Sequence, residues 1–232
     1  MAPNPATAPN LFDRALLAAR LSRARRAGAA TFLLERVTAD MADRLQAVSR
    51  SFSAAADLWT PGDGLGDALR GRVGSVDPIG FSEAEALGLP PESLDLMVSA
   101  LAFQFVNDLP GVLAQIRRAL KPDGLLLAAM LGGDTLTELR QSFAAAEAEC
   151  EGGVSPRVAP FADLRDIGAL LQRAGFALPV TDVDRVVVRY ASAFALMADL
   201  RRMGATNVLH ERRHAPTRRA TMLRMAQIYG ER

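Results

Sequence analysis

The spacing of hydrophobic residues changes twice along the chain and divides the sequence into three zones. In the first zone, apolar residues recur three and four positions apart and Gly28 interrupts them, which predicts two helices. In the second zone, short apolar runs alternate with amphipathic stretches; in the third, helical spacing returns around a loop rich in Arg and His. The predicted organisation is a disordered lead-in (1–10), an N-terminal helical cap (11–50), a central domain (51–190) and a C-terminal helical tail (191–232).

The central zone has the alternation of strands and helices that is typical of α/β proteins. Its apolar runs predict strands at 54–58, 73–77, 94–101, 124–130 and 178–190. Its amphipathic stretches predict helices at 67–70, 109–120, 135–149 and 161–174. Right-handed crossovers place such helices on both faces of a mostly parallel, Rossmann-like sheet, and ligands of such sheets bind at the carboxyl ends of the strands.

Composition narrows the classes of partner and site. The chain has 232 residues, of which 50% are hydrophobic, so it can bury a core. Its net charge is +1, which gives no general affinity for nucleic acid. Cys150 is the only cysteine and His210 and His214 are the only histidines, so we expect neither a disulfide nor a metal site. No apolar run approaches the roughly 20 residues that cross a bilayer. These features predict a soluble protein of a reducing compartment, and we expect a cytoplasmic location.

The segment after the first predicted strand resembles a nucleotide-binding loop. Asp57 lies near the end of that strand, and the following turn carries Gly62 and Gly64, which allow backbone N–H groups to approach a ligand closely. Asp77 follows at the spacing of about 20 residues at which a second acid binds ribose hydroxyls. Alternatively, Asp77 only starts a turn before Pro78. Trp59 stands where such loops usually have their first glycine.

Two longer motifs relate the chain to a known superfamily. S-L-D-L-M-V-S-A-L and R-R-A-L-K-P-D-G-L-L-L-A resemble the fourth and fifth strands of class I S-adenosylmethionine-dependent methyltransferases. The stretches F-Q-F-V-N-D-L-P-G-V-L, L-G-G-D-T-L-T-E-L-R-Q-S-F and L-F-D-R-A-L-L are similar to bacterial relatives of the mitochondrial complex I assembly factor of the arginine-hydroxylase type. The malonyl carrier-protein methyltransferases of biotin synthesis are a more distant likeness.

The resemblance implies S-adenosylmethionine as cofactor and assigns residues to it. The cofactor side would comprise Asp57, Trp59, Gly62, Gly64, Asp77, Glu85, Ser99, Ala100 and Leu101. Within this set Asp77 would bind the ribose, and Glu85, or else Glu83, would reach the adenine amino group. The substrate side would comprise Phe103, Phe105 and Arg157. Arg157 would hold a substrate carboxylate or a protein partner, or else pair with Asp163 and Asp166. No catalytic residue is identified, because an activated methyl group needs alignment rather than proton transfer.

Three departures from the superfamily leave two functions open. Trp59 replaces a glycine, residues 78–93 are too few for the usual third strand and its helix, and the final antiparallel strand is not present. An unpaired sheet edge would favour self-association of the chain. One hypothesis is a methyltransferase that acts on a protein substrate or in complex I assembly, with Trp59 stacked on adenine. The other is a non-catalytic protein that binds a protein partner, with Trp59 filling the cofactor pocket. Arginine hydroxylation is a third outcome that the resemblance allows.

Overall fold

The central sheet is a four-stranded, fully parallel sheet in a computed structural model that describes residues 10–232. The strands are β1 (Ala55–Leu58), β2 (Val76–Ile79), β3 (Leu94–Ala100) and β4 (Leu120–Ala129), in the order β2-β1-β3-β4. The predicted lead-in lies outside the described residues apart from Asn10. The prediction of an α/β fold with a mostly parallel sheet is confirmed.

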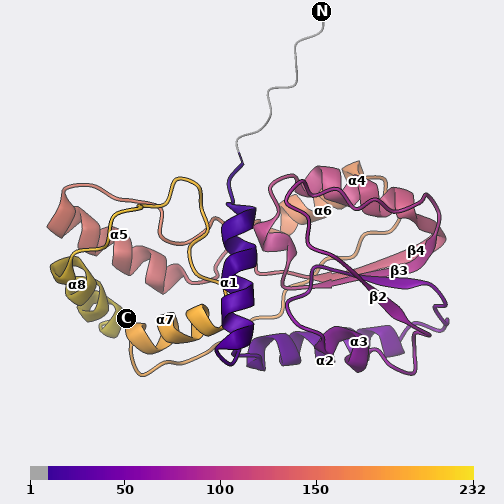
Figure 1. The fold of residues 1–232 in the computed structure, drawn as a ribbon, viewed down its shortest axis with the longest axis horizontal. Helices are drawn as coiled ribbons and strands as arrows, with labels where there is room; N and C mark the ends of the chain where they lie inside the picture. The colour runs from indigo at the N-terminus through magenta and orange to yellow at the C-terminus, as the bar shows by residue number, and fades with distance from the viewer. Residues whose placement is uncertain (1–9) are drawn as a thin grey trace, which may run out of the picture.

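Helices cover both faces of the sheet (Figure 1). The helices α4 (Leu109–Ala119) and α6 (Leu164–Arg173) lie on one face, and α2 (Phe32–Gln46) and α3 (Gly64–Ala68) lie on the other. Alternate residues of β3 enter the two cores: Met97 packs in the α4 cluster, whereas Leu96 and Val98 pack in the α2 cluster. Burial on both faces explains why this strand reads as one continuous apolar run.

A separate helical layer stands beside the sheet, and one helix lies between the two parts (Figure 1). This layer contains α5 (Thr137–Glu151), α7 (Ala193–Arg202) and α8 (Arg219–Gly230), and α1 (Arg14–Arg26) lies between it and the sheet. The two N-terminal and two C-terminal helices agree with the predicted pattern, whereas the exact domain limits stay a prediction. No helix among residues 10–232 is long and apolar enough to span a membrane.

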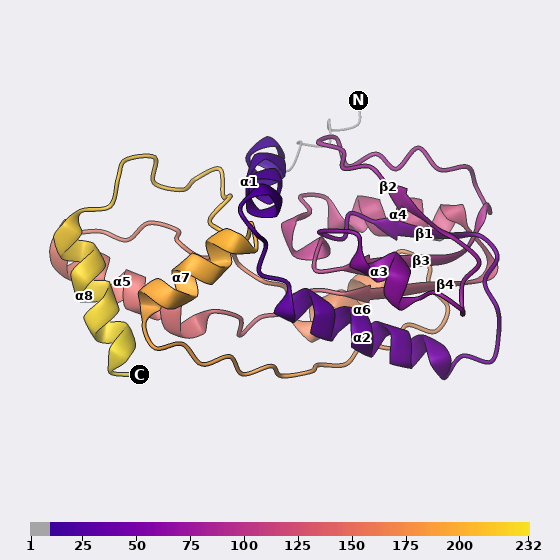
Figure 2. The same ribbon diagram turned by 60° about the horizontal axis from the view of Figure 1, so that its bottom comes forward.

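The predicted strand at 178–190 is wrong. In the structure this segment is irregular and runs beside α2 (Figure 2), where Asp182 pairs with Arg44 at 2.8 Å and Asp184 pairs with Arg36 at 2.9 Å. A strand needs a neighbour for its backbone hydrogen bonds, and none pairs with this segment within the described chain. Alternation of apolar residues therefore did not produce a strand here.

The second strand is displaced from its predicted position. We predicted residues 73–77, but β2 begins at Val76 and includes Pro78. Proline cannot donate a backbone hydrogen bond, and it is tolerated because β2 is an edge strand of the sheet. The described residues between β2 and β3 form no further strand or helix, as the shortened edge predicts.

Candidate functional site

The turn after β1 is tied to the end of β3 by side-chain hydrogen bonds. The Thr60 hydroxyl donates to Asp57 Oδ1 at 2.5 Å and accepts the Ala100 N–H at 2.9 Å. The buried Ser99 hydroxyl donates to the Leu58 carbonyl at 2.8 Å. These bonds fix the carboxyl ends of the two central strands, which is where parallel sheets bind ligands.

Asp57 is the most perturbed acid at this edge of the sheet. Burial raises the pKa of its carboxyl group, and the hydrogen bonds from the hydroxyl and N–H of Thr60 oppose this shift. A carboxyl group that is both desolvated and placed at the ligand edge is a candidate functional group. The cofactor role of Asp57 stays a prediction.

An arginine from α1 occupies the space above these strand ends. Arg14 is 5% exposed, and its guanidinium carbon lies 4.5 Å from the Trp59 ring centroid and 4.2 Å from the Phe81 ring centroid. The Nε atom of Arg14 lies 3.4 Å from Oε1 of Glu85. We refer to Trp59, Phe81 and Glu85 as the aromatic corner. A guanidinium suits it because aromatic faces and a carboxylate all attract cations.

The remaining donors of Arg14 are only partly satisfied. One terminal nitrogen donates to the Ser82 carbonyl at 2.9 Å, and the other donates to the Phe105 carbonyl at 3.3 Å. The Nε atom has no hydrogen-bond partner among the described residues. Burial lowers the pKa of Arg14, and the Glu85 carboxylate opposes this shift. The corner therefore encloses Arg14 closely but satisfies its hydrogen-bond donors incompletely.

Glu85 joins two loops at this edge of the sheet. Its Oε1 accepts the N–H of Asn107 at 2.7 Å, and its Oε2 accepts the N–H of Asp108 at 2.8 Å. Asp108 in turn caps α4 by accepting the Gly111 N–H. Glu85 and Trp59, both assigned to the cofactor from the sequence, each contact Arg14, and their cofactor roles stay predictions.

Trp59 has an unusual backbone conformation. Its φ of 63° lies in the left-handed region that favours glycine, which is consistent with a glycine at this position in related loops. The indole is nevertheless buried, and its Nε1 donates to the Gly80 carbonyl at 3.0 Å. Packing and this hydrogen bond hold the residue in a conformation that it would otherwise rarely adopt.

The other predicted cofactor residues are less uniformly placed. Gly62 has a φ of 93°. Gly64 begins α3, and a side chain at this position would meet no atom within 4 Å of its Cβ. Leu101, with a φ of 54°, follows the buried Ala100 at the end of β3. Asp77 does not lie at the end of its strand as predicted, because it is the second residue of β2 and is exposed.

A cavity of about 260 Å³ lies beside this edge, between α1, α5 and α7. Phe105 lines it, whereas Phe103 is buried in the sheet core and does not line it. The substrate role of Phe105 stays a prediction. The cavity lining is otherwise mostly apolar, with two arginines; it includes Leu131, Leu139, Phe143, Met197, Arg20 and Arg157. This cavity could hold an acceptor group next to the strand ends.

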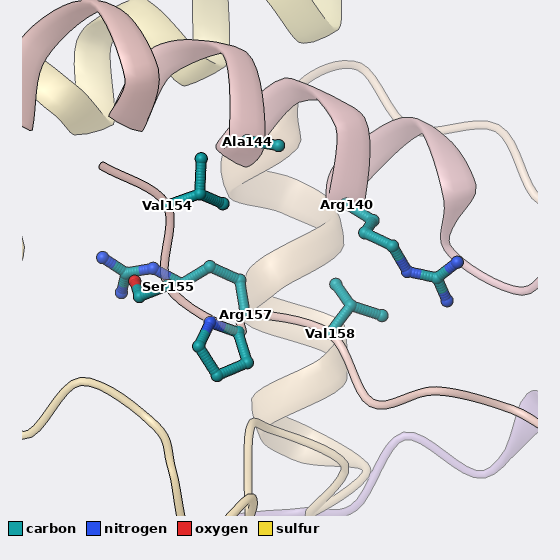
Figure 3. A pocket seen from close by; sticks show the side chains of 7 residues that line it. Arg140, Ala144, Val154, Ser155, Arg157 and Val158 are labelled. Carbon is teal, nitrogen blue, oxygen red and sulfur yellow. The ribbon is translucent and has the colours of Figure 1, made fainter. Parts of the chain in front are cut away.

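Arg157 also borders a second cavity, of about 330 Å³, under α5 (Figure 3). Its Nε donates to Glu147 at 2.8 Å, and Nη1 donates to Thr217 at 2.8 Å. Burial opposes ionisation of Glu147, yet the donors of Ser155 and Arg157 lower its pKa overall. Arg157 is therefore held by Glu147, and the predicted alternative of pairing with Asp163 and Asp166 is wrong.

Sequence reasoning missed Arg14, Arg20 and Phe81. A signal for Arg14 existed, because it shares one face of α1 with Leu17 and Leu21, three and seven positions away. A charged residue on an apolar helix face is a candidate for a buried, paired group. No sequence signal identified Phe81, which stands in the loop after β2.

Comparisons with known proteins give similarities over the whole chain. Residues 67–128 match a family described as "Methyltransferase domain". "Arginine-hydroxylase NDUFAF5, mitochondrial" of Homo sapiens is 37% identical over 257 residues, which cover 100% of this chain and 74% of that protein. The protein of the same name in Rattus norvegicus is 37% identical over 99% of this chain and 74% of its own length.

More distant similarities cover part of the chain. A malonyl-[acyl-carrier protein] O-methyltransferase of Xylella fastidiosa is 41% identical over 64% of this chain and 48% of that protein. A crystal structure of an S-adenosylmethionine-dependent methyltransferase from Mesorhizobium loti has a TM-score of 0.36 and 16% identity, covering 60% of this chain and 81% of that one.

The comparisons correct one prediction and support another. The expectation of a cytoplasmic location is wrong, because the relatives that match nearly the whole chain are named as mitochondrial proteins. The methyltransferase-domain match supports S-adenosylmethionine as the cofactor. In the described part of the chain, no group of three or more His, Cys, Asp or Glu side chains could hold a metal ion.

Proposed function

Because the chain belongs to the family of the NDUFAF5 arginine-hydroxylases, we propose that it acts on a protein substrate during assembly of respiratory complex I, with S-adenosylmethionine as cofactor. The observation that carries this proposal is 37% identity extending over 99–100% of the chain. The parallel sheet, with helices on both faces, is consistent with such a cofactor. The non-catalytic alternative, in which Trp59 fills the cofactor pocket, receives no support from these relatives.

The cofactor would bind over the carboxyl ends of β1 and β3. The aromatic corner offers two ring faces and a carboxylate acceptor, which suit the planar base and amino group of adenine. Asp57 and the open backbone at Gly64 would lie on the methionine side. In the present conformation Arg14 occupies the aromatic corner, so these residues fit adenine only when Arg14 is elsewhere.

The acceptor would enter the cavity lined by Phe105. When bound, the cofactor supplies an activated methyl group, so transfer depends on alignment more than on an acid or base. The residues of this chain would then have three tasks, which are to orient the acceptor, to exclude water and to place the acceptor beside the strand ends. The apolar lining of the cavity, with Leu139 and Met197, suits the exclusion of water.

Hydroxylation of an arginine is a second candidate reaction. It is favoured by the name of the relatives, which are arginine-hydroxylases. The two reactions differ in the mass that they add to the substrate. Methylation replaces a hydrogen atom with the methyl group of the cofactor, whereas hydroxylation inserts an oxygen atom and requires an external oxidant such as dioxygen. This difference allows one experiment to separate them.

The test is deletion of the gene in the organism that encodes it. We expect a loss of assembled complex I on native gels and the loss of one modification from a complex I subunit, detected by peptide mass spectrometry. Complementation with the wild-type gene should restore both, and Asp57→Asn should restore neither. Normal complex I assembly with unchanged subunit masses in the deletion strain would refute the proposed function.

A further inference from the structure

The two residues just before α1 are anchored to both halves of the molecule. The Phe12 N–H donates to Asn107 Oδ1 at 2.7 Å, and the Asn107 amide returns a hydrogen bond to the Phe12 carbonyl at 3.1 Å. The Asp13 N–H donates to the Val208 carbonyl at 2.8 Å, in the loop before α8. These bonds deliver Arg14, the next residue, to the edge of the sheet.

The position that Arg14 occupies is one that a planar ligand would use. A guanidinium and an adenine ring are both flat and both carry N–H donors, so both can lie on an aromatic face and donate to a carboxylate. Atoms in contact lie about 3.5 to 4 Å apart. At 4.5 Å from Trp59 and 4.2 Å from Phe81, the guanidinium already fills the contact layer of both rings. A second planar group cannot occupy the same faces.

We propose that Arg14 is an internal plug of the cofactor site, and that its side chain and the adenine of S-adenosylmethionine compete for the aromatic corner. The inference rests on the proposed function, because that proposal assigns the cofactor to this edge. The Arg14 side chain then acts as a gate: the cofactor binds when this side chain leaves the corner, and the site is closed when it returns.

The contacts of Arg14 are consistent with a displaceable group. Its Nε lacks a hydrogen-bond partner among the described residues, and its contact with the Phe105 carbonyl is long, at 3.3 Å. The carboxylate of Glu85 keeps two backbone donors, from Asn107 and Asp108, whether or not Arg14 is present. The Glu85 carboxylate is therefore held in place by bonds that do not involve the plug.

Departure of Arg14 would also affect the loop before α8, which contacts Asp13. Asp13 bonds to Val208, and its carboxylate lies 3.4 Å from Arg212 in the same loop. Movement at the start of α1 would pull on this loop and on the wall of the cavity that Val208 lines.

The direct test is titration with S-adenosylhomocysteine, followed by tryptophan fluorescence. Trp59 is the only tryptophan in the sequence, so the signal comes from the corner itself. We expect Arg14→Ala to bind at least about tenfold more tightly than the wild-type protein, because it has no plug. Arg25→Ala is the matched control, since Arg25 is an exposed residue of the same helix, and it should bind like the wild type.

A second measurement uses the wild-type protein, so it does not depend on the folding of a variant. Phenylglyoxal labels accessible arginines, and the labelled peptides are identified by mass spectrometry. We expect Arg14 to be protected in the free protein and labelled at saturating S-adenosylhomocysteine, while Arg25 is labelled in both states. Continued protection of Arg14 with the ligand bound would overturn the plug.

The outcomes separate this inference from the proposed function. If the wild type binds clearly and Arg14→Ala binds equally or more weakly, the plug is refuted, whereas the assignment of the cofactor to this site is retained. If neither the wild type nor a folded Arg14→Ala protein binds S-adenosylhomocysteine, the cofactor assignment in the proposed function is refuted, and the plug is refuted with it. Tighter binding by Arg14→Ala together with labelling of Arg14 supports both.

Discussion

Arg14 and Glu85 form a buried ion pair, with Arg14 Nε 3.4 Å from Glu85 Oε1 and side chains only 4% and 7% exposed. The pair joins the N-terminal helix to the loop after β2. Charges that lose their water are stable only when their partners replace it, and here backbone N–H groups and carbonyls contribute to that replacement. The same pair closes the ligand edge of the sheet, so stability and access to the site depend on the same residues.

Removal of Glu85 should destabilise the protein strongly. We expect Glu85→Ala to lower the free energy of unfolding by about 3 to 5 kcal/mol, because it leaves the Arg14 charge and two backbone donors unpaired. Urea denaturation followed by circular dichroism measures this loss. Glu83→Ala, at an exposed position of the same loop, should change stability by less than about 0.5 kcal/mol. A similar small effect for both variants would contradict the buried pair.

Asp57 should show the opposing effects on stability and binding that are typical of a functional residue. Burial raises the pKa of its carboxyl group, so the folded state holds the proton more tightly than the unfolded state does. Stability is therefore lost as the pH rises from the unfolded pKa, about 3.9, through the folded pKa. The Asp57→Asn substitution removes the titrating carboxyl group and with it this loss, and it should also weaken binding of S-adenosylhomocysteine.

The pH dependence of this variant provides the decisive measurement. Thermal melts of Asp57→Asn and wild type should agree near pH 3 and diverge above about pH 4, with the variant more stable at neutral pH. Asp67→Asn, at an exposed position of α3, serves as the comparison. A stability difference that stays constant with pH would argue against a desolvated carboxylate at position 57.

Asp95 should give the opposite pH dependence, because its pKa is lowered. Hydrogen bonds from Ser53, Lys121 and the Ala54 N–H stabilise its carboxylate, and they tie β3 to the chain before β1 and to β4. A lowered pKa gives stability that is fully present above the unfolded value of about 3.9 and is lost as the pH falls further. We expect Asp95→Asn to cost about 1.5 to 3 kcal/mol at pH 7.

Acid titration of the same variant tests the direction in which the stability contribution of Asp95 changes with pH. The difference in unfolding free energy between wild type and Asp95→Asn should narrow below about pH 4, as the wild-type carboxylate loses its advantage. Asp43→Asn, an exposed substitution on α2, should show no such change. A gap that widens in acid would exclude the proposed network.

The sequence was sufficient to predict the central sheet, for a physical reason. The strand β3 is buried on both faces, and Leu94, Met97 and Val98 therefore form a continuous apolar signal. The segment 178–190 has a similar apolar signal but no neighbouring strand among the described residues, and a strand depends on that neighbour. The spacing of apolar residues indicates which side chains can be buried, whereas a strand also requires a neighbouring strand for its backbone hydrogen bonds.

The candidate site was predictable only where its residues come from local motifs. Trp59 and Glu85 were assigned to one ligand from the sequence, and in the structure both contact the Arg14 side chain. The occupant, Arg14, comes from a helix distant in sequence, so only the tertiary fold reveals it. Asp77 was misplaced because the start of its strand was predicted three residues too early.

Trp59 distinguishes the two hypotheses drawn from the sequence, and the Arg14→Ala background makes it testable. If the indole stacks on adenine after Arg14 leaves, then adding Trp59→Gly should weaken S-adenosylhomocysteine binding about tenfold, since stacking of a base on an aromatic ring contributes roughly 1 to 3 kcal/mol. If the indole instead blocks the pocket, the same change should tighten binding. Titration calorimetry is required, because Trp59→Gly removes the only tryptophan.

A control substitution separates stacking from folding in this last experiment. Glycine relieves the left-handed backbone at position 59, where φ is 63°, by about 1 to 2 kcal/mol, but loss of the buried indole costs about 3 to 5 kcal/mol. Trp59→Phe keeps a ring face and most of the packing, so in the Arg14→Ala background it should retain most of the affinity. Tighter binding by the glycine variant than by the phenylalanine variant would show that the ring at position 59 obstructs the cofactor, and would reject its role as a stacking surface.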